Sequence, residues 1–211
     1  MARGISEFKT KLINGGARPN LFLVRLNFPQ TLSEIADIGP IDSSEVLGDR
    51  SQFLVKTAQL PASTIAEVTV PFRGRNLKVA GDRTFEPWTV TIINDEDFQL
   101  RTAFERWMNV LSKLDDATGV TNPSSYMTDA YVQQLGRGDR RFSTTNNGGQ
   151  SSVLRTYKFY DIFPTEVSAI DLSYDTTNDY ETFDVTFQVQ YFTVGNSLES
   201  SGSSAGEALI E

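Results

Sequence analysis

The chain has 211 residues, of which 39% are hydrophobic and 11% aromatic, so it can bury a sizeable core and is not disordered as a whole. With 27 acidic and 19 basic residues it carries a formal charge of −8, which argues against a surface that holds nucleic acid tightly. Cysteine and histidine are both absent, which excludes disulfides, thiolate or imidazole metal ligands and every catalytic triad with a histidine base.

The first part of the chain is predicted to contain a short helix, two strands and an insertion. Residues Ile5 to Leu12 have helical spacing, with a frayed tail as the alternative, and Asn20 to Phe28 has the pattern of a buried strand. A second strand is expected from Phe53 to Gln59, before Leu60-Pro61. The acidic stretch 31–52 contains helix-breaking residues and is interpreted as a loop-like insertion on the hairpin formed by these two strands.

The middle of the chain has the clearest local pattern. Apolar and polar residues alternate on both sides of Arg73-Gly74-Arg75-Asn76, which predicts a β-hairpin from Glu67 to Asp82. Ala80 to Thr84 is expected to form a second turn. A further strand follows, with apolar residues on one face at Trp88, Val90 and Ile92.

An amphipathic helix is predicted from Asp95 to Lys113. Asn94 is expected to be its N-cap, and the carboxylates at 95–97 suit the positive end of the helix dipole. One apolar stripe consists of Leu100, Ala103, Phe104, Trp107, Met108 and Leu111. Such a stripe is expected to cover a sheet.

Residues 115–150 have the polar composition of a long surface excursion, with a short helix possible around 124–135. The tripeptide Arg137-Gly138-Asp139 within it is interpreted as part of an exposed basic loop rather than an adhesion site. Three strands are expected after it, at Leu154 to Phe163, Val167 to Tyr174 and Thr182 to Phe192. The last strand alternates an apolar side with a polar side formed by Asp184, Thr186, Gln188 and Gln190.

Several motifs, in this order, resemble the tail tube proteins of contractile-tailed bacteriophages. The motifs are Ala17-Arg18-Pro19-Asn20-Leu21-Phe22, Leu60-Pro61-Ala62, Val79-Ala80-Gly81-Asp82-Arg83-Thr84-Phe85, Trp88-Thr89-Val90-Thr91, Asn94-Asp95-Glu96 and Phe163-Pro164-Thr165. The resemblance implies a mainly β fold: a β-sandwich or barrel of two antiparallel sheets, one flanking amphipathic α-helix and a projecting β-hairpin arm. It further implies one tail-tube domain over 1–195, with insertions at about 31–52 and 115–150, and a flexible tail over 196–211.

The resemblance also implies a function and its partners. Proteins of this family form hexameric rings that stack into the inner tail tube, a conduit for DNA during genome delivery. The implied partners are other copies of the chain, the tail sheath, baseplate and tail-terminator proteins, and transiently the tape measure protein and DNA in the lumen. We expect a virion component assembled in the host cytoplasm, with no cofactor, no enzymatic activity and no stable sequence-specific binding of nucleic acid.

Two sets of residues are candidate assembly sites. The hairpin is too small to form its own core and carries positive charge on an acidic protein, so it is expected to be an inter-subunit arm. Its contact residues are predicted to be Val70, Phe72, Arg73, Arg75, Leu77 and Lys78. The polar side of the last strand, Asp184, Thr186, Gln188 and Gln190, is the candidate lumen surface because a water-filled channel needs a polar wall.

Other functions stay open at this stage. Within the same fold, the alternatives are a baseplate tube initiator and a phage-like contractile secretion tube. A β-sandwich module for adhesion or carbohydrate binding would explain the aromatic content, but both tryptophans fall on predicted core faces. A lytic hydrolase would need two facing carboxylates, and the Asp95-Glu96-Asp97 cluster is better explained by helix capping.

Overall fold

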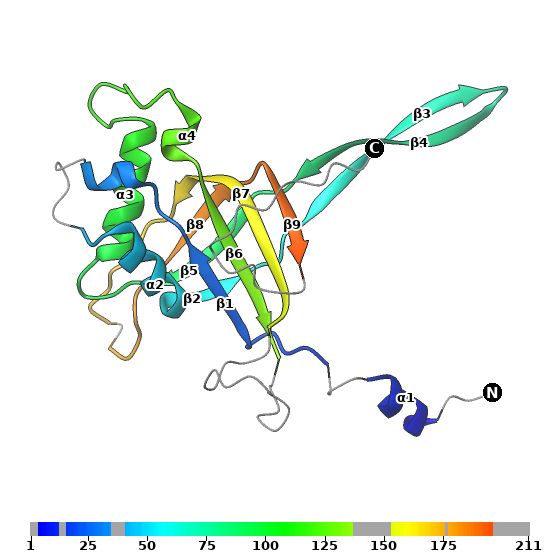
Figure 1. The fold of residues 1–211 in the computed structure, drawn as a ribbon, viewed down its shortest axis with the longest axis horizontal. Coiled ribbons are helices and arrows are strands. Elements are labelled where there is room, and N and C mark those ends of the chain that lie inside the picture. The colour runs from blue at the N-terminus through cyan, green and yellow to red at the C-terminus, as the bar shows by residue number, and fades with distance from the viewer. Residues whose placement is uncertain (1–3, 13–15, 35–40, 137–152, 176, 196–211) are drawn as a thin grey trace, which may run out of the picture.

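The computed structural model describes residues 4–12, 16–34, 41–136, 153–175 and 177–195 (Figure 1). Its helical elements are α1 (Ile5–Lys11), the 3-10 turn η2 (Gln30–Glu34), α2 (Ser44–Leu54), α3 (Gln99–Leu111) and α4 (Pro123–Tyr126). Its strands are β1 (Phe22–Leu26), β2 (Val55–Ala58), β3 (Ser63–Phe72), β4 (Arg75–Phe85), β5 (Trp88–Ile93), β6 (Thr128–Leu135), β7 (Val153–Val167), β8 (Thr182–Gln188) and β9 (Tyr191–Gly195). Within these ranges, no helix is long and apolar enough to cross a membrane.

Seven of the strands form one antiparallel sheet in the order β1-β6-β7-β8-β5-β2, with β9 also paired to β7. The long strand β7 joins the two halves of this sheet, because its first half pairs with β6 and β9 while its second half pairs with β8. Asp161 lies where pairing to β9 gives way to pairing to β8, and its φ of 52° interrupts the extended backbone there. The sheet therefore divides into β1-β6-β7-β9 and β2-β5-β8-β7.

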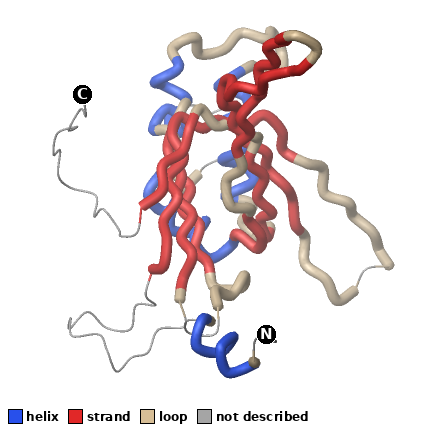
Figure 2. The backbone as a smooth tube through the Cα atoms, turned by 90° about the vertical axis from the view of Figure 1, so that its right-hand side faces the viewer, coloured by secondary structure: helices blue, strands red, loops and turns tan. Residues whose placement is uncertain are grey.

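The two halves of the sheet pack against each other around one hydrophobic core, as Figure 2 shows from the side. Trp88 of β5 stacks on Phe159 of β7, with ring centroids 4.4 Å apart. The indole nitrogen of Trp88 donates a hydrogen bond to the carbonyl oxygen of Gln59, so this buried ring keeps a polar partner. The predicted mainly β fold, with a sandwich, a flanking helix and a projecting hairpin, is confirmed.

Helix α3 closes one end of the sandwich (Figure 1). The predicted apolar stripe is buried at Leu100, Ala103, Phe104 and Trp107, together with Val110. Met108 and Leu111, also assigned to the stripe, are only partly buried. Arg106 is buried too, and its guanidinium donates to the carbonyl oxygen of Leu32 in η2, a contact that the periodicity did not predict.

The predicted start of this helix was wrong. Helix α3 begins at Gln99, after Phe98 in a left-handed conformation with φ of 52°. The side-chain amide of Asn94 donates to Glu181 at 2.8 Å instead of capping the helix. Asp95 accepts a hydrogen bond from Arg50 of α2 at 2.9 Å, so the acidic run is held by a distant arginine rather than by the helix dipole.

The interpretation of 31–52 as a loop-like insertion on a hairpin was also wrong. Strand β1 pairs with β6 and β2 pairs with β5, so the two strands do not form a hairpin. The segment between them includes α2, which runs to Leu54 and packs its buried face on β1. Predicted strand residue Phe53 is therefore helical, and it is 84% exposed. Residues 35–40 of this segment lie outside the described ranges.

The surface excursion predicted over 115–150 contains a central strand. Strand β6 lies between β1 and β7, and Ala130 and Val132 are buried in the core. The helix considered around 124–135 is limited to the single turn α4. The prediction of a surface excursion was wrong for this part because it relied on composition, and a strand with polar residues on its outer face can be as polar overall as a loop. The Arg137-Gly138-Asp139 tripeptide lies outside the described residues.

The last part of the chain corrects two more predicted boundaries. Strand β7 continues to Val167, and the strand predicted from Val167 to Tyr174 is irregular chain beyond that residue. The final predicted strand divides into β8 and β9, which pair with successive parts of β7. Phe183, Val185, Phe187 and Val189 are buried as expected, whereas Tyr191 is exposed. The predicted tail over 196–211 lies outside the described residues.

Candidate assembly site: the arm and the outer sheet faces

The hairpin β3–β4, here called the arm, projects well beyond the sandwich (Figure 1). Its tip is a two-residue turn in which Arg73 and Gly74 both have positive φ, 46° and 79°. Such a turn matches the right-handed twist of the strands that it joins. Glycine at 74 adopts this conformation without strain, whereas Arg73 is an uncommon residue for it. The predicted hairpin is confirmed, and its turn lies inside the predicted Arg73–Asn76 segment.

The arm is longer than predicted. Its strands pair from Phe72 and Arg75 at the tip to Ser63 and Phe85 at the base, so the second turn predicted at 80–84 does not form. The register shifts by one residue between Ile65 and Glu67, which marks a β-bulge.

The extra residue of the bulge lies in β4, where Gly81 and Asp82 together face the single residue Ala66 of β3. A Cβ atom at Gly81 would lie 3.0 Å from the carbonyl oxygen of Ala66 and 3.2 Å from Cγ2 of Val68. The glycine therefore permits close approach of the two strands. The sequence Gly-Asp suggested a turn, but pairing with β3 decides the conformation.

One face of the arm is apolar and exposed. Val70 lies opposite Leu77, and Val68 lies opposite Val79, so these side chains share a face with Phe72. Phe72 is 65% exposed and Leu77 is 61% exposed. We call Val68, Val70, Phe72, Leu77 and Val79 the apolar arm face. Contiguous exposed apolar side chains of this kind mark an interaction surface.

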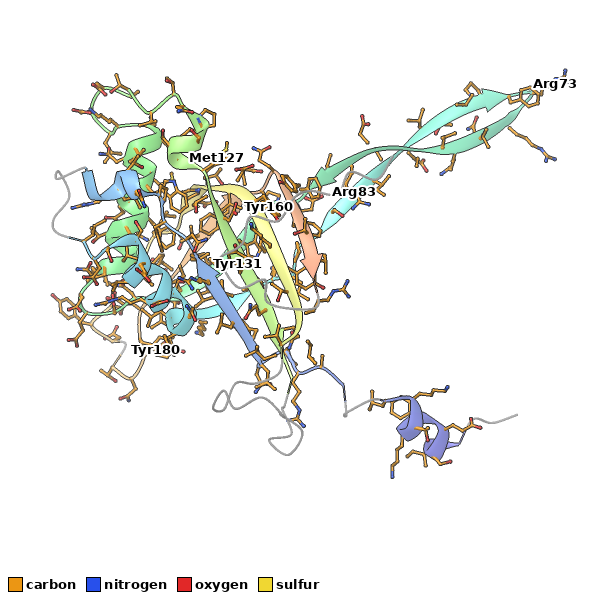
Figure 3. The ribbon with its side chains drawn as sticks, in the orientation of Figure 1. Arg73, Arg83, Met127, Tyr131, Tyr160 and Tyr180 are labelled. Atoms are coloured by element: carbon orange, nitrogen blue, oxygen red, sulfur yellow. The ribbon has the colours of Figure 1, made fainter. Side chains whose placement is uncertain are left out.

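The positive charge of the arm is concentrated at its tip. Figure 3 shows Arg73 at the far end and Arg83 nearer the sandwich. The guanidinium of Arg73 lies 5.3 Å from the ring centroid of Phe72. Lys78 lies on the other face of the arm and forms an ion pair with Glu67 at 2.9 Å. Lys78 is thus neutralised within the arm, and among the predicted contact residues Arg73 and Arg75 supply the net charge.

The outer face of β2-β5-β8 is lined by hydroxyl groups. Thr89 and Thr186 form a hydrogen bond across β5 and β8 at 3.1 Å, and Thr57 donates to Thr91 at 2.7 Å across β2 and β5. We call Thr57, Thr89, Thr91, Asp184, Thr186 and Gln188 the threonine face. It contains three of the four predicted lumen residues, whereas Gln190 is exposed in the link between β8 and β9. The neighbouring threonines of β5 were not predicted, although they alternate with Trp88, Val90 and Ile92 in the sequence.

The outer face of β6-β7-β9 has a different chemistry. Tyr160 and Tyr191 stack with centroids 4.6 Å apart, and Lys158 lies 4.2 Å from the ring centroid of Tyr160. Burial by itself would lower the pKa of Lys158, but its hydrogen bond to Asp129 and the charge of that carboxylate raise the pKa above the usual range of lysine. Lys158 is therefore fixed as a cation on this face. We call Tyr131, Lys158, Tyr160 and Tyr191 the tyrosine face, since the strand register places them on one side of the sheet. Figure 3 labels Tyr131 and Tyr160.

The residues in the described ranges contain no group of three or more acidic side chains suited to hold a metal ion. The chain presents an apolar, basic-tipped arm and two outer sheet faces with different side chains. Exposed features of this kind favour association with other protein chains.

The sequence of this chain is similar to one known protein family and to individual proteins of known name. Residues 17–195 match the family described as "Phage tail tube protein". "Tail tube protein gp19" of Enterobacteria phage T4 is 30% identical over 176 residues, which cover 83% of this chain and 90% of the relative. "Tail tube protein" of Serratia phage KSP90 is 24% identical over 190 residues, 89% and 94% of the two chains.

Solved structures share the fold at lower sequence identity. A chain in the anti-feeding prophage baseplate has a TM-score of 0.55 at 12% identity, covering 86% of this chain and 96% of its own. A chain in the anti-feeding prophage tube-terminating cap has a TM-score of 0.55 at 15% identity, covering 86% and 92%. The predicted family and the predicted absence of enzymatic activity are therefore confirmed by the sequence relatives: this chain belongs to the phage tail tube protein family, whose members are structural proteins of the virion tail.

Proposed function

We propose that this chain forms hexameric rings that stack into the inner tube of a contractile tail and that the tube conducts DNA during genome delivery. The observation that carries the proposal is the apolar arm face, which projects beyond the sandwich and stays exposed in the single chain. An identical copy in the next ring would bury this face. Because such a head-to-tail contact does not close on itself, it can repeat from ring to ring and build a tube of any length. The six-fold symmetry of the related anti-feeding prophage baseplate supports rings of six.

The two outer sheet faces suggest how the chain is oriented in the tube. We assign the threonine face to the lumen, with Asp184, Thr186 and Gln188 on the channel wall. Hydroxyl and amide groups bind water but carry no positive charge that would attract the phosphates of DNA. Gln190 would lie at the margin of this wall. We assign the tyrosine face to the outside, since tyrosine is enriched at protein interfaces. Its partner there would be the sheath.

Other assignments follow from the same proposal. Residues 1–195 form one tail-tube unit and 196–211 a tail, in keeping with the family match over 17–195. The tube would meet a baseplate protein at one end and a terminator at the other, because chains of the same fold occur in the anti-feeding prophage baseplate and in the sheath/tube terminator of an extracellular contractile injection system. Tape measure protein and DNA would occupy the lumen transiently. Assembly would take place in the host cytoplasm.

Removing the apolar arm face tests the stacking. The variant Phe72→Ser/Leu77→Ser should keep the circular dichroism and melting temperature of the sandwich but form single rings or monomers in electron micrographs. The matched control Thr69→Ser/Asn76→Ser changes the opposite face of the arm and should form tubes. Full-length tubes from the first variant would show that this face is not the contact between rings.

The charge at the arm tip gives a second test. Arg73→Glu/Arg75→Glu should stop stacking while the chain stays folded, because a neighbouring acidic subunit would then repel the tip. In the triple variant that adds Lys78→Glu, Glu67 would lose its partner as well. The swap Glu67→Lys/Lys78→Glu keeps both the pair and the net charge, so it should assemble normally. Normal tubes from the double arginine variant would rule out charge as a driver of assembly.

A further inference from the structure

Helix α1 is an exposed apolar helix. Ile5, Phe8 and Leu12 are spaced three and four residues apart, so they share one side of the helix. Phe8 is 64% exposed, and none of the residues of α1 is buried. A seven-residue helix is marginal by itself in water. Burial of this apolar side against another surface would stabilise the helix.

A matching surface lies on α2. The inner side of α2 is buried at Leu47 and Ser51, but its outer side carries Val46 and Phe53, two turns apart. Phe53 is 84% exposed, more than any residue of the apolar arm face. Two exposed apolar stripes of similar length thus occur on two helices of the same chain.

The charges beside the two stripes are complementary. Lys9 and Lys11 lie in the last turn of α1. Glu45 and Asp49 are exposed on α2 beside Val46 and Phe53. Asp49 accepts a hydrogen bond from Gln52 of the same helix at 3.1 Å and forms a long 3.8 Å ion pair with Arg25, yet its side chain stays 62% exposed. Packing the two stripes together would bring the lysines near the carboxylates.

The helices of one chain do not meet. Figures 1 and 2 show α1 standing apart from the sandwich, whereas α2 packs along β1. The family match begins at residue 17, after the end of α1. The segment 12–21 joins α1 to β1 and would span on the order of 30 Å if fully extended, so its length does not hold α1 against its own sandwich.

We propose that α1 of one subunit packs its apolar stripe on the outer side of α2 of a second copy of this chain. The contact would tie neighbouring subunits together independently of the arm. This inference rests on the proposed stacking of identical copies, although it concerns a different surface. The occupant is a second copy because the complementary stripe and charges belong to this chain itself.

Disulfide trapping between two single-cysteine variants tests the contact. The chain has no cysteine, so Phe8→Cys and Phe53→Cys each introduce one thiol. The two variants are mixed, assembled, oxidised mildly and digested, and mass spectrometry identifies the disulfide-linked peptides. A peptide that joins positions 8 and 53 can come only from two different chains in this mixture. We expect it to be the main product.

The control mixture pairs Phe8→Cys with Leu172→Cys, whose native side chain is 79% exposed on a loop. We expect little or no linkage between positions 8 and 172. Equal yields in both mixtures, or no linkage between 8 and 53, would overturn the inference. So would linkage that appears only when both cysteines are placed in one chain.

Electron micrographs of the same samples report separately whether tubes form. Tubes without the 8–53 linkage would refute the helix contact and leave the proposed function intact. Linkage in unassembled protein without tubes would support the helix contact and contradict the proposed function. Absence of the linkage from both assembled and unassembled fractions refutes the helix contact in either case.

Discussion

Ser51 shows how one hydroxyl group protects the edge of the sheet. Strand β1 is an outer strand of the sheet, and its Leu26 N–H donates to Oγ of Ser51 at 3.0 Å. The same hydroxyl donates to the carbonyl oxygen of Gly48 within α2. Because Ser51 is fully buried, water cannot replace it. Helix α2 thereby blocks an edge that could otherwise pair with another chain.

We predict that Ser51→Ala destabilises the fold by about 1–3 kcal/mol, since the buried Leu26 N–H would lose its acceptor. Urea unfolding followed by circular dichroism measures the change. Ser43→Ala, at an exposed position just before the same helix, serves as the control and should be close to neutral. Equal stability of the two variants would mean that the backbone donor finds another partner.

At the scale of elements, α3 is the helix on which the core depends most. Phe104 is fully buried and packs edge to face against Phe183 and Phe187 of β8, with centroids 6.2 and 5.9 Å away. The opposite side of the helix is wetter, with Glu105 accepting a hydrogen bond from Arg101 at 2.7 Å. The helix is thus amphipathic in the structure as it is in the sequence.

Phe104→Ala is expected to cost about 3–5 kcal/mol and to yield mostly insoluble protein, because it opens a cavity between α3 and β8. Glu105→Ala removes only an exposed pair on the same helix, worth roughly 0.2–0.5 kcal/mol, and should stay soluble. Expression, solubility and thermal melts of both variants give the comparison. A Phe104→Ala protein that melts like the unaltered chain would contradict the packing described.

The arm is the second element with a testable behaviour. It is a two-stranded ribbon whose apolar face is exposed, and an isolated pair of strands is only marginally stable in water. Amide hydrogens over 63–85 should therefore exchange faster in the unassembled chain than in tubes. Hydrogen exchange read by mass spectrometry measures this, with β5 and β8 as slowly exchanging references in both states. Equal rates for the arm in the two states would show that assembly does not order it.

At the scale of the whole molecule, the negative charge bears on how DNA passes. A formal charge of −8 on each subunit repels a polyanion, whereas the proposed lumen face is mostly hydroxyl and amide. We predict no stable complex with duplex DNA at physiological salt, either for single subunits or for tubes. Mobility-shift assays should show free DNA even at high protein concentration. Nanomolar binding would contradict the prediction, and a steep loss of that binding with salt would identify a hidden basic surface.

The sequence alone predicted those elements whose conformation is set mainly by residues close to them in the chain. The alternation in β5 and β8 and the stripe of α3 were predicted correctly because burial of one face leaves a period that can be counted. The arm was predicted because its turn joins two alternating runs. The family was predicted from short motifs, and the sequence relatives confirm it.

Tertiary structure decided what depends on distant partners. Strand β6 has a polar outer face and is a strand because β1 and β7 pair with both of its edges. The acidic run at 95–97 does not cap α3, since Arg50 of α2 holds Asp95. The Ala80–Thr84 segment extends the arm instead of turning, because β3 supplies hydrogen-bond partners along it. In each case a contact between residues far apart in the sequence outweighed the local sequence pattern. The free energy of such a contact depends on both partners, so it cannot be read from a short segment of the chain.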